Sequence, residues 1–276
     1  MLLDLVRRLH RNKPLSGRRI AVLATDGFEM VELVIPAAAM RLAGAVVDVI
    51  SIHPGRIRGM NLHEPASTVG VDLTLEQADP AEYDGLLIPG GFVNPDLMRQ
   101  SARAREFVRA FGRSGKPIAS LCHGPWVLAS AGLLKGRRLT SWPGLRDDLI
   151  NAGATWLNEP LVHDDNIVTS RGPQDLKPFV TAITRLFAGA KRELEQAFPS
   201  TRATQSAPPP DEPPRLVVDV MRWMPKPSVR TFLCLAVASL AVSKYLRRHQ
   251  QGVRSLAGCA AQPARPSSAG QFAMSR

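Results

Sequence analysis

The order of its apolar segments is the feature that most constrains how this chain folds. Between residues 19 and 187, short apolar runs alternate with longer stretches in which apolar residues recur at helical spacing. The first unit has a run at 19–24, a helical stretch at 29–43 that Gly44 ends, and a second run at 46–52. Strand–helix–strand units form parallel sheets with right-handed crossovers. The sequence therefore predicts a doubly wound α/β domain with its site at the carboxyl ends of the strands.

The remaining elements follow the same alternation with one interruption. Strands are predicted at 84–89 and 118–121, and a hairpin-like pair at 162–170. Helices are predicted at 101–113, from the turn after residue 121 to Gly132, and at 145–152 and 173–187. Residues 53–80 break the rhythm, and their Pro, Gly and alternating apolar residues predict a small β excursion followed by a loop.

The segment 116–126, KPIASLCHGPW, predicts a buried strand, a sharp turn at Cys122 and a helix that begins just beyond it. A buried cysteine is often an inert core residue. A strand–turn–helix elbow, however, lifts its side chain out of the sheet edge and places it near a helix N-terminus, whose partial positive charge favours a thiolate. We therefore predict that Cys122 is a nucleophile.

Other polar groups are expected at the same edge of the sheet. Gly90 and Gly91 follow the strand at 84–89, and the N–H groups of Gly91 and His123 could face one carbonyl oxygen if the two strands are neighbours. The side chain of His123 either pairs with a carboxylate as a base or, as is usual for adjacent residues on a turn, points away from Cys122.

Three carboxylates are candidates for the acid or base. Glu29 and Glu32 lie on one side of the first helix, near its start and at the same sheet edge as Cys122. Either could act on the thiol, or both could simply favour the helix N-terminus. Asp96 follows the two glycines closely in GGFVNPD.

Several segments, in this order, resemble the PfpI family of the DJ-one/PfpI superfamily: FEMVELVIPAAAMRLAG, VDLTLEQADPAEYDGLLIPGG, GKPIASLCHGPWVLASAGLLKGR, TSWPGLRDDLINAGA and VTSRGPQDL. The resemblance covers residues 18–188. It implies a class I glutamine amidotransferase-like fold, namely a flavodoxin-like three-layer α/β sandwich with a mostly parallel sheet. It also implies assembly into homo-oligomers, either dimers or hexamers.

The resemblance also assigns roles by position. It implies that Cys122 is the reactive nucleophile, that Glu32 contacts and tunes the thiol, and that Gly91 and His123 are oxyanion-hole donors. His123 is also the third catalytic member, which in some relatives pairs with a carboxylate of a neighbouring subunit. Here that position is Asp96, after a one-residue insertion and with a shorter side chain than the glutamate of the best-known form.

Relatives of this kind include cysteine peptidases, protein or nucleotide deglycases, glyoxalases and stress chaperones. We predict a stress-related, cofactor-free hydrolase or lyase that acts on glyoxal, methylglyoxal or their protein adducts, so its partner is a small carbonyl compound or a glycated protein. The alternatives are an intracellular cysteine peptidase and a non-enzymatic redox sensor or chaperone. A glutamine amidotransferase fits poorly, because its late His–Glu pair is matched only by His163-Asp164-Asp165 in the predicted hairpin.

The charge of the chain is concentrated at its ends. The net charge of +11 divides into +5 for residues 1–19, −2 for 20–188 and +8 for 189–276. We predict a basic amphipathic segment at 1–17, a Pro-rich disordered linker at 189–228, a short apolar helix at 229–248 and a disordered basic tail at 249–276. The basic ends are expected to be solvated flanks, and nucleic acid is not an expected partner.

The segment 229–248 leaves three alternatives open. The 13 residues between Arg230 and Lys244 would extend about 20 Å as a helix, against about 30 Å for a bilayer core. The segment is therefore a helix that contacts a membrane surface or a partner, a tail without fixed structure, or an anchor with snorkelling flanks. Three cysteines, an odd number without disulfide or zinc spacing, favour a reducing, cytoplasmic setting and no bound metal.

Overall fold

The computed structural model describes residues 13–200, 203–213, 215, 218 and 219. Residues 1–12 of the expected N-terminal segment, the predicted helix at 229–248 and the tail at 249–276 lie outside this part of the chain. All elements named below belong to one compact unit that ends at Arg215. Within the residues that the structure describes, no helix is long and apolar enough to cross a membrane.

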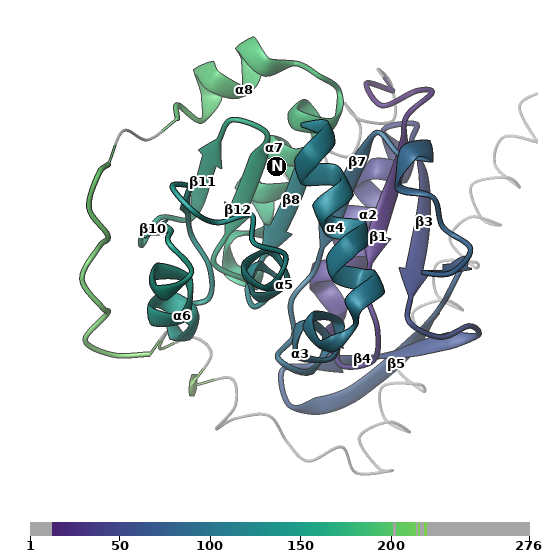
Figure 1. Ribbon diagram of the computed structural model, residues 1–276, viewed down its shortest axis with the longest axis horizontal. Helices are drawn as coiled ribbons and strands as arrows, with labels where there is room; N and C mark the ends of the chain where they lie inside the picture. Colours follow the sequence, from purple (N-terminus) through teal and green to yellow (C-terminus); the bar gives the residue numbers. More distant parts are fainter. Residues whose placement is uncertain (1–12, 201–202, 214, 216–217, 220–276) are drawn as a thin grey trace, which may run out of the picture. The chain divides into compact units, whose positions relative to one another are not determined.

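A seven-stranded sheet forms the middle layer of this unit (Figure 1). Its strand order is β11-β12-β8-β7-β1-β3-β6, and neighbouring strands are parallel except β11 and β12. The strands are β1 (Arg19–Leu23), β3 (Val46–Ser51), β6 (Leu73–Thr74), β7 (Gly85–Ile88), β8 (Ile118–Leu121), β11 (Leu161–Asp164) and β12 (Ile167–Ser170). The prediction of a mostly parallel sheet is confirmed.

Helices cover both faces of the sheet, which completes the predicted three-layer sandwich. Strand β1 shows why: Ile20 and Val22 enter one hydrophobic cluster, whereas Ala21 and Leu23 enter a second one on the other face. The first cluster contains buried residues of α2 (Met30–Leu42) and α7 (Leu176–Phe187). The second contains residues of α3 (Val93–Gln100), α4 (Ala102–Ser114), α5 (Pro125–Ser130) and α6 (Arg146–Asn151), of which α4 and α5 lie in front of the sheet in Figure 1.

Smaller elements surround this core. The β excursion predicted at 53–80 is a hairpin of β4 (Arg56–Asn61) and β5 (Glu64–Gly70), which pairs with the short β2 (Phe28–Glu29). A separate pair joins β9 (Arg138–Leu139) to β10 (Thr155–Trp156). Short 3₁₀ turns η1 (Pro80–Glu82), η2 (Pro143–Leu145) and η3 (Pro173–Asp175) connect larger elements.

Helix α3 is the main element that the sequence pattern did not predict. It begins two residues after Gly91, and its first turn contains Asn94 and Pro95, residues that are typical of turns. Proline is tolerated in the first turn of a helix, where its missing N–H has no intrahelical partner. The helix is held to the domain by Met98, which is fully buried in the second cluster.

The prediction of disorder at 189–228 was wrong for its first part. Residues Lys191–Ala197 form helix α8, whose Leu194 is fully buried in the first hydrophobic cluster and whose flanking Phe198 packs against that cluster. Leu194 and Phe198 are four residues apart, so both lie on one side of the helix. The prediction missed this short apolar face because residues 189–228 were assigned together, on the Pro-rich composition of the residues that follow the helix. Residues 220–228 lie outside the described part of the chain.

The candidate site lies where three neighbouring strands end. From β1 the chain crosses to β3 on one side, and it later enters β7 on the other side of β1. Such a reversal of strand order leaves a crevice at the carboxyl ends of the strands. Strands β1, β7 and β8 end there at Leu23, Ile88 and Leu121.

Candidate active site

The elbow after β8 holds Cys122 in an unusual backbone conformation. Its φ angle is +57°, in the left-handed region, which costs a non-glycine residue about 1 kcal/mol. Two hydrogen bonds hold this conformation: the N–H of Cys122 donates to the Ser170 carbonyl at 3.0 Å, and its carbonyl accepts from the Trp142 N–H at 3.0 Å. The side chain is 6% exposed. The thiol is therefore oriented by three segments that are distant in sequence.

Glu32 reaches the same place from helix α2 and is fully buried. Its Oε2 accepts the N–H of Gly90 at 2.8 Å. Its Oε1 has no hydrogen-bond partner within the described residues. The carboxyl and the Cys122 thiol nevertheless lie close enough for each to shift the pKa of the other. Burial, followed by the charge of Glu29, raises the pKa of Glu32 to about 8, although hydrogen bonds from Cys122 and Gly90 oppose the rise.

Glu29 has a different environment, which separates the two glutamates that the sequence left as alternatives. Its Oε2 accepts the N–H of Leu62 at 2.9 Å, so its carboxylate fastens the β4–β5 hairpin. Burial raises its pKa, and the bond from Leu62 lowers it. The structure brings Glu32, and not Glu29, to Cys122.

The glycine pair after β7 allows a close approach that a larger residue would block. A Cβ atom on Gly90 would lie 2.6 Å from the Cys122 Cβ and 2.7 Å from the Glu32 Oε2. Gly91 has a φ of +76° and passes so close to Gly27 that a Cβ would lie 2.2 Å from the Gly27 carbonyl oxygen. Glycine at position 90 thus permits the close approach of Cys122 and Glu32, and glycine at position 91 lets the turn pass against the segment that follows β1.

Strands β7 and β8 are neighbours, and backbone N–H groups from the turns that follow them lie near the sulfur of Cys122. That these groups bind a carbonyl oxygen stays a prediction. Hydrogen bonds from the N–H groups of His123 and Gly91 lower the pKa of the thiol. Burial and the negative charge of an ionised Glu32 act more strongly in the opposite direction and raise it well above its usual range.

The side chain of His123 does not point away from its neighbour. Its Nδ1 lies 3.2 Å from the Cys122 Sγ, because the left-handed turn at Cys122 brings the ring back over the thiol. Burial lowers the pKa of His123 to about 4, so the imidazole is neutral at pH 7. Its ring contacts Phe92, Trp126 and Trp142 at centroid distances of 6.4, 5.5 and 5.9 Å.

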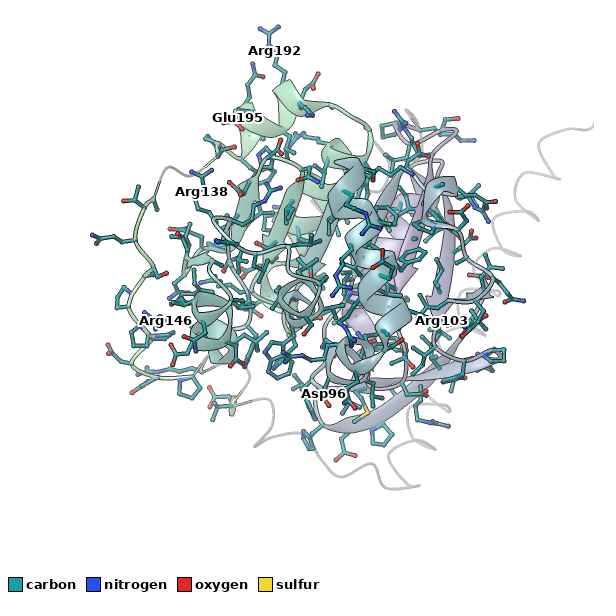
Figure 2. The ribbon with its side chains drawn as sticks, viewed as in Figure 1. Asp96, Arg103, Arg138, Arg146, Arg192 and Glu195 are labelled. Atoms are coloured by element: carbon teal, nitrogen blue, oxygen red, sulfur yellow. The ribbon has the colours of Figure 1, made fainter. Side chains whose placement is uncertain are left out.

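Asp96 is not brought to this cluster within one chain. It lies on the exposed side of α3, where its Oδ2 accepts a hydrogen bond from Gln100 Nε2 at 3.1 Å (Figure 2). Nothing in a single chain joins it to His123 among the described residues.

The His163-Asp164 pair lies at the wrong end of the sheet for an amidotransferase. On β11, His163 pairs with Val168 of β12, which in turn lies beside Ala119 of β8, and Asp164 is one step nearer the amino end of β8. Asp164 binds Arg138 rather than His163. Both residues are therefore remote from Cys122, which follows the carboxyl end of β8.

Sequence reasoning missed Asn94 and Trp142. Asn94 is fully buried; its Oδ1 accepts the N–H of Thr25 at 2.7 Å, and its Nδ2 donates to the carbonyls of Pro89 and Gly90 at 3.0 and 3.1 Å. It therefore fixes the glycine turn relative to β1. The only sequence signal for Asn94 is weak: it is a polar residue three positions after a Gly-Gly pair that ends a strand. No sequence signal pointed to Trp142, because it lies in a loop that is distant in sequence.

The comparisons with known proteins cover the same part of the chain. The model of the DJ-1/PfpI family matches residues 18–186. The chain is 42% identical over 168 residues to the deglycase PYRAB04690 of Pyrococcus abyssi, which covers 61% of this chain and 98% of that protein. It is also 42% identical over 164 residues to YraA of Bacillus subtilis, provisionally named a cysteine protease, with 59% and 94% covered. The crystal structure of Drosophila melanogaster DJ-1beta matches with a TM-score of 0.58 at 26% identity, covering 67% of this chain and 98% of that chain.

Proposed function

The chain belongs to the DJ-1/PfpI family, and from this premise we propose that it is a cysteine-dependent enzyme that removes glyoxal- or methylglyoxal-derived groups. In this proposal Cys122 is the nucleophile, Glu32 is the proton-transfer group, and the N–H groups of Gly91 and His123 form the oxyanion hole. One observation carries it: a buried thiol shares its surroundings with a carboxyl whose pKa is about 8 and with two directed N–H groups. The relative of P. abyssi is named a deglycase.

Methylglyoxal illustrates the chemistry. Sulfur attacks the aldehyde carbon, the thiol proton passes to the carbonyl oxygen, and the two N–H groups stabilise that oxygen while it is negative. In its ionised form, Glu32 then takes the hydrogen of this carbon as a proton and returns it to the neighbouring carbonyl carbon through an enediol, which leaves a thioester. Water cleaves the thioester, releases lactate and restores the thiol. The first carbon is oxidised and the second is reduced, so no external oxidant is needed.

The test is lactate production from methylglyoxal by the full chain. The variants Cys122→Ala and Glu32→Gln are expected to lose activity, the second by about 10²–10⁴-fold if Glu32 transfers the proton. Glu29→Gln is the matched control, because it makes the same chemical change three residues earlier, at the carboxylate that binds Leu62. It is expected to retain most of the activity. Unchanged lactate production in both Cys122→Ala and Glu32→Gln would contradict the proposal.

A cysteine peptidase is the second candidate. The 3.2 Å contact between Sγ of Cys122 and Nδ1 of His123 favours it, because a cysteine–histidine pair can act within one chain. YraA also carries a protease name. Cleavage of casein that purified wild type performs and Cys122→Ala does not would support this function. If neither reaction depends on Cys122, reversible oxidation of the thiol is the remaining role, and intact mass after mild peroxide measures it.

We also propose that the enzyme is a homo-oligomer in which Asp96 meets His123 of a second subunit. The exposed position of Asp96 and its lack of contact with His123 in one chain are consistent with this arrangement. In an oligomer Asp96→Asn would raise KM or lower kcat for methylglyoxal while leaving the free energy of unfolding unchanged. If the protein is monomeric and Asp96→Asn has wild-type kinetics, the pairing does not exist.

A further inference from the structure

A pocket of about 300 Å³ lies beside the candidate active site. Two distant parts of the chain form its walls, one of them the extension that follows the family domain. The domain contributes η2 and the start of α6, and the extension contributes a Pro-rich stretch. The lining residues are Trp142, Pro143, Gly144, Arg146, Asp147, Pro209, Pro210, Glu212 and Pro213.

Main-chain hydrogen bonds hold the extension in place. The N–H of Ala207 donates to the Trp156 carbonyl at 2.8 Å, and the N–H of Trp156 donates to Ser206 Oγ at 3.0 Å. Nε of Arg146 donates to the Ala207 carbonyl at 2.8 Å. These bonds fasten residues 206 and 207 beside β10, immediately before three consecutive prolines, whose fixed φ angles make the following stretch stiff.

Trp142 connects this pocket to the nucleophile. Its N–H donates to the Cys122 carbonyl at 3.0 Å, and its ring stacks on the His123 ring at a centroid distance of 5.9 Å and an interplanar angle of 21°. The same residue lines the pocket. A group bound in the pocket would therefore lie one indole ring away from the imidazole that contacts the thiol.

The walls combine apolar surfaces with exposed carboxylate oxygens. Trp142 and four prolines supply the apolar part. Asp147 accepts from Arg146 through Oδ1 only, and Glu212 accepts from Arg215 through Oε2 only, so Asp147 Oδ2 and Glu212 Oε1 accept no hydrogen bond from the described residues. The guanidinium of Arg146 is already bound to Ala207 and Asp147.

This chemistry suits a ligand with an apolar stem and a cationic tip. Each carboxylate of the lining is paired with an arginine, Asp147 with Arg146 and Glu212 with Arg215. The second oxygen of each carboxylate therefore remains to accept a hydrogen bond from a cationic group. Aromatic faces attract ammonium and guanidinium groups, and lysine and arginine side chains bury their alkyl stems on apolar surfaces. A phosphate group would meet these two carboxylate oxygens, and both arginines already bind carboxylates.

We propose that this pocket holds a lysine or arginine side chain of a protein substrate, next to the modified residue at Cys122. The proposal rests on the deglycase function proposed above and narrows its substrates to adducts on basic protein segments rather than on nucleotides. The extension thereby acts as part of the substrate-binding site, because Pro209, Pro210 and Glu212 form one wall of the pocket.

Binding is measured separately from turnover, with the full chain carrying Cys122→Ala. The probes are N-acetyl-Lys-Ala-Lys amide, its glutamate counterpart and guanosine monophosphate, titrated while tryptophan fluorescence is recorded. The lysine peptide is expected to bind with saturation, and more weakly at high salt. Adding Asp147→Asn and Glu212→Gln should weaken it by about fivefold, the effect of losing two exposed ion pairs. Adding Glu106→Gln instead, an exposed carboxylate on α4 outside the pocket, should have no effect.

Equal binding of the lysine and glutamate peptides, tighter binding of the nucleotide, or no effect of the double substitution would overturn the proposal. With catalytically intact protein, a methylglyoxal-modified arginine peptide should have a lower KM when lysine, rather than alanine, adjoins the modified residue. If the wild-type protein produced no lactate from methylglyoxal, only the proposed function would be contradicted, because the peptide titration measures binding to the pocket without turnover. Conversely, active enzyme with equal KM values for the two peptides would overturn the pocket and leave the function standing.

Discussion

At the scale of single residues, the candidate site is a set of ionisable groups kept uncharged by burial. The pKa of Glu32 is raised to about 8 and that of His123 is lowered to about 4, so at pH 7 the carboxyl is protonated and the imidazole is neutral. The rise in the pKa of Cys122 comes partly from ionised Glu32. That repulsion is absent while Glu32 keeps its proton. A protonated carboxyl beside the sulfur can instead donate a hydrogen bond to a thiolate.

The two shifted pKa values predict an unusual dependence of stability on pH. From pH 4.5 to 8 the folded chain retains a proton on Glu32 that the unfolded chain releases, so this group lowers the free energy of unfolding as pH rises, by up to about 1.4 kcal/mol per pH unit. From pH 4 to 6.5, His123 binds a proton in the unfolded chain but not in the folded chain. The stability that this group contributes is therefore fully present above pH 6.5 and is lost as pH falls.

The two contributions oppose each other between pH 4.5 and 6.5, and only that of Glu32 remains between 6.5 and 8. Urea unfolding of wild type and Glu32→Gln across this range gives a difference curve in which all other groups cancel. We expect the variant to gain stability relative to wild type steadily from pH 4.5 to 8. A difference curve that is flat with pH would mean that Glu32 ionises normally.

Replacement of Gly90 tests the close approach at the same scale. Gly90→Ala places a methyl group 2.6 Å from Cys122 Cβ and 2.8 Å from the His123 nitrogen, and overpacking of this kind costs about 1–3 kcal/mol. We expect loss of both stability and lactate production. Gly70→Ala is the control, because a Cβ there meets nothing within 4 Å and its φ is not positive. Equal stability and activity for both variants would refute the close contact.

At the scale of elements, short segments outside the regular alternation position the site. Helix α3 carries Asn94, which donates to a carbonyl of the glycine turn. The hydrogen bond between Trp142 and Cys122 joins the start of η2 to the elbow. Helix α5 has six residues, so its dipole is weak. Burial therefore outweighs the effect of the helix N-terminus that the sequence led us to expect at the thiol.

Removal of the Asn94 side chain should loosen the glycine turn. Asn94→Ala deletes the acceptor of the Thr25 N–H and the donor to Pro89 and Gly90, all in a buried place. Leaving buried polar groups unpaired costs about 1–3 kcal/mol each, so we expect a clear drop in the urea midpoint and in kcat. Asn151→Ala, at the exposed end of α6, is the matched control. Wild-type values for Asn94→Ala would show that the turn holds without it.

Helix α8 should contribute measurably to the stability of the domain. Leu194→Ala removes a fully buried side chain and is expected to cost about 2–5 kcal/mol. Arg192→Ala on the same helix points to solvent (Figure 2) and should cost little. Urea unfolding monitored by tryptophan fluorescence measures both. Equal midpoints for the two variants would mean that α8 does not pack on the domain.

At the scale of the whole molecule, apolar groups remain exposed beside the site. Phe92, Val93 and Leu97 lie at and within helix α3 and are 48%, 37% and 37% exposed. Asp96 is on the same helix. Exposed apolar residues rimmed by polar ones are typical of protein interfaces. This surface is therefore the place where we expect a second subunit to pack.

A charge introduced on this surface should weaken the assembly. Leu97→Lys is expected to shift the mass measured by light scattering toward that of a monomer, since burying a lysine in an interface is unfavourable. Val46→Lys is the matched control, because it introduces the same charge at a residue that is 57% exposed at the start of β3. It is expected to leave the mass unchanged. The surface on α3 is excluded as the interface if both variants keep the mass of wild type.

Much of the fold could be predicted because its signals are local. The strands that begin near Arg19, Val46 and Ile118, and the helices after the first and third of them, follow from apolar periodicity within a few residues, and the structure confirms the parallel sheet. The family follows from motifs that are also short, and the match over residues 18–186 confirms it. Turn chemistry and a strand ending in Gly-Gly were enough to predict which sheet edge carries the site.

The tertiary structure decided which of these residues meet. Sequence alone could not choose between Glu29 and Glu32, because the helical spacing placed both on one side of the predicted helix. In the structure Glu29 binds Leu62, whereas Glu32 binds Gly90. The orientation of His123 depends on the backbone of Cys122, which Ser170 and Trp142 hold from distant segments. The hydrogen bond that holds Ala207 of the extension to Trp156 is likewise a contact between residues distant in sequence. Periodicity reports the neighbours of a residue along the chain, whereas burial, pKa and the shape of a pocket depend on neighbours in space.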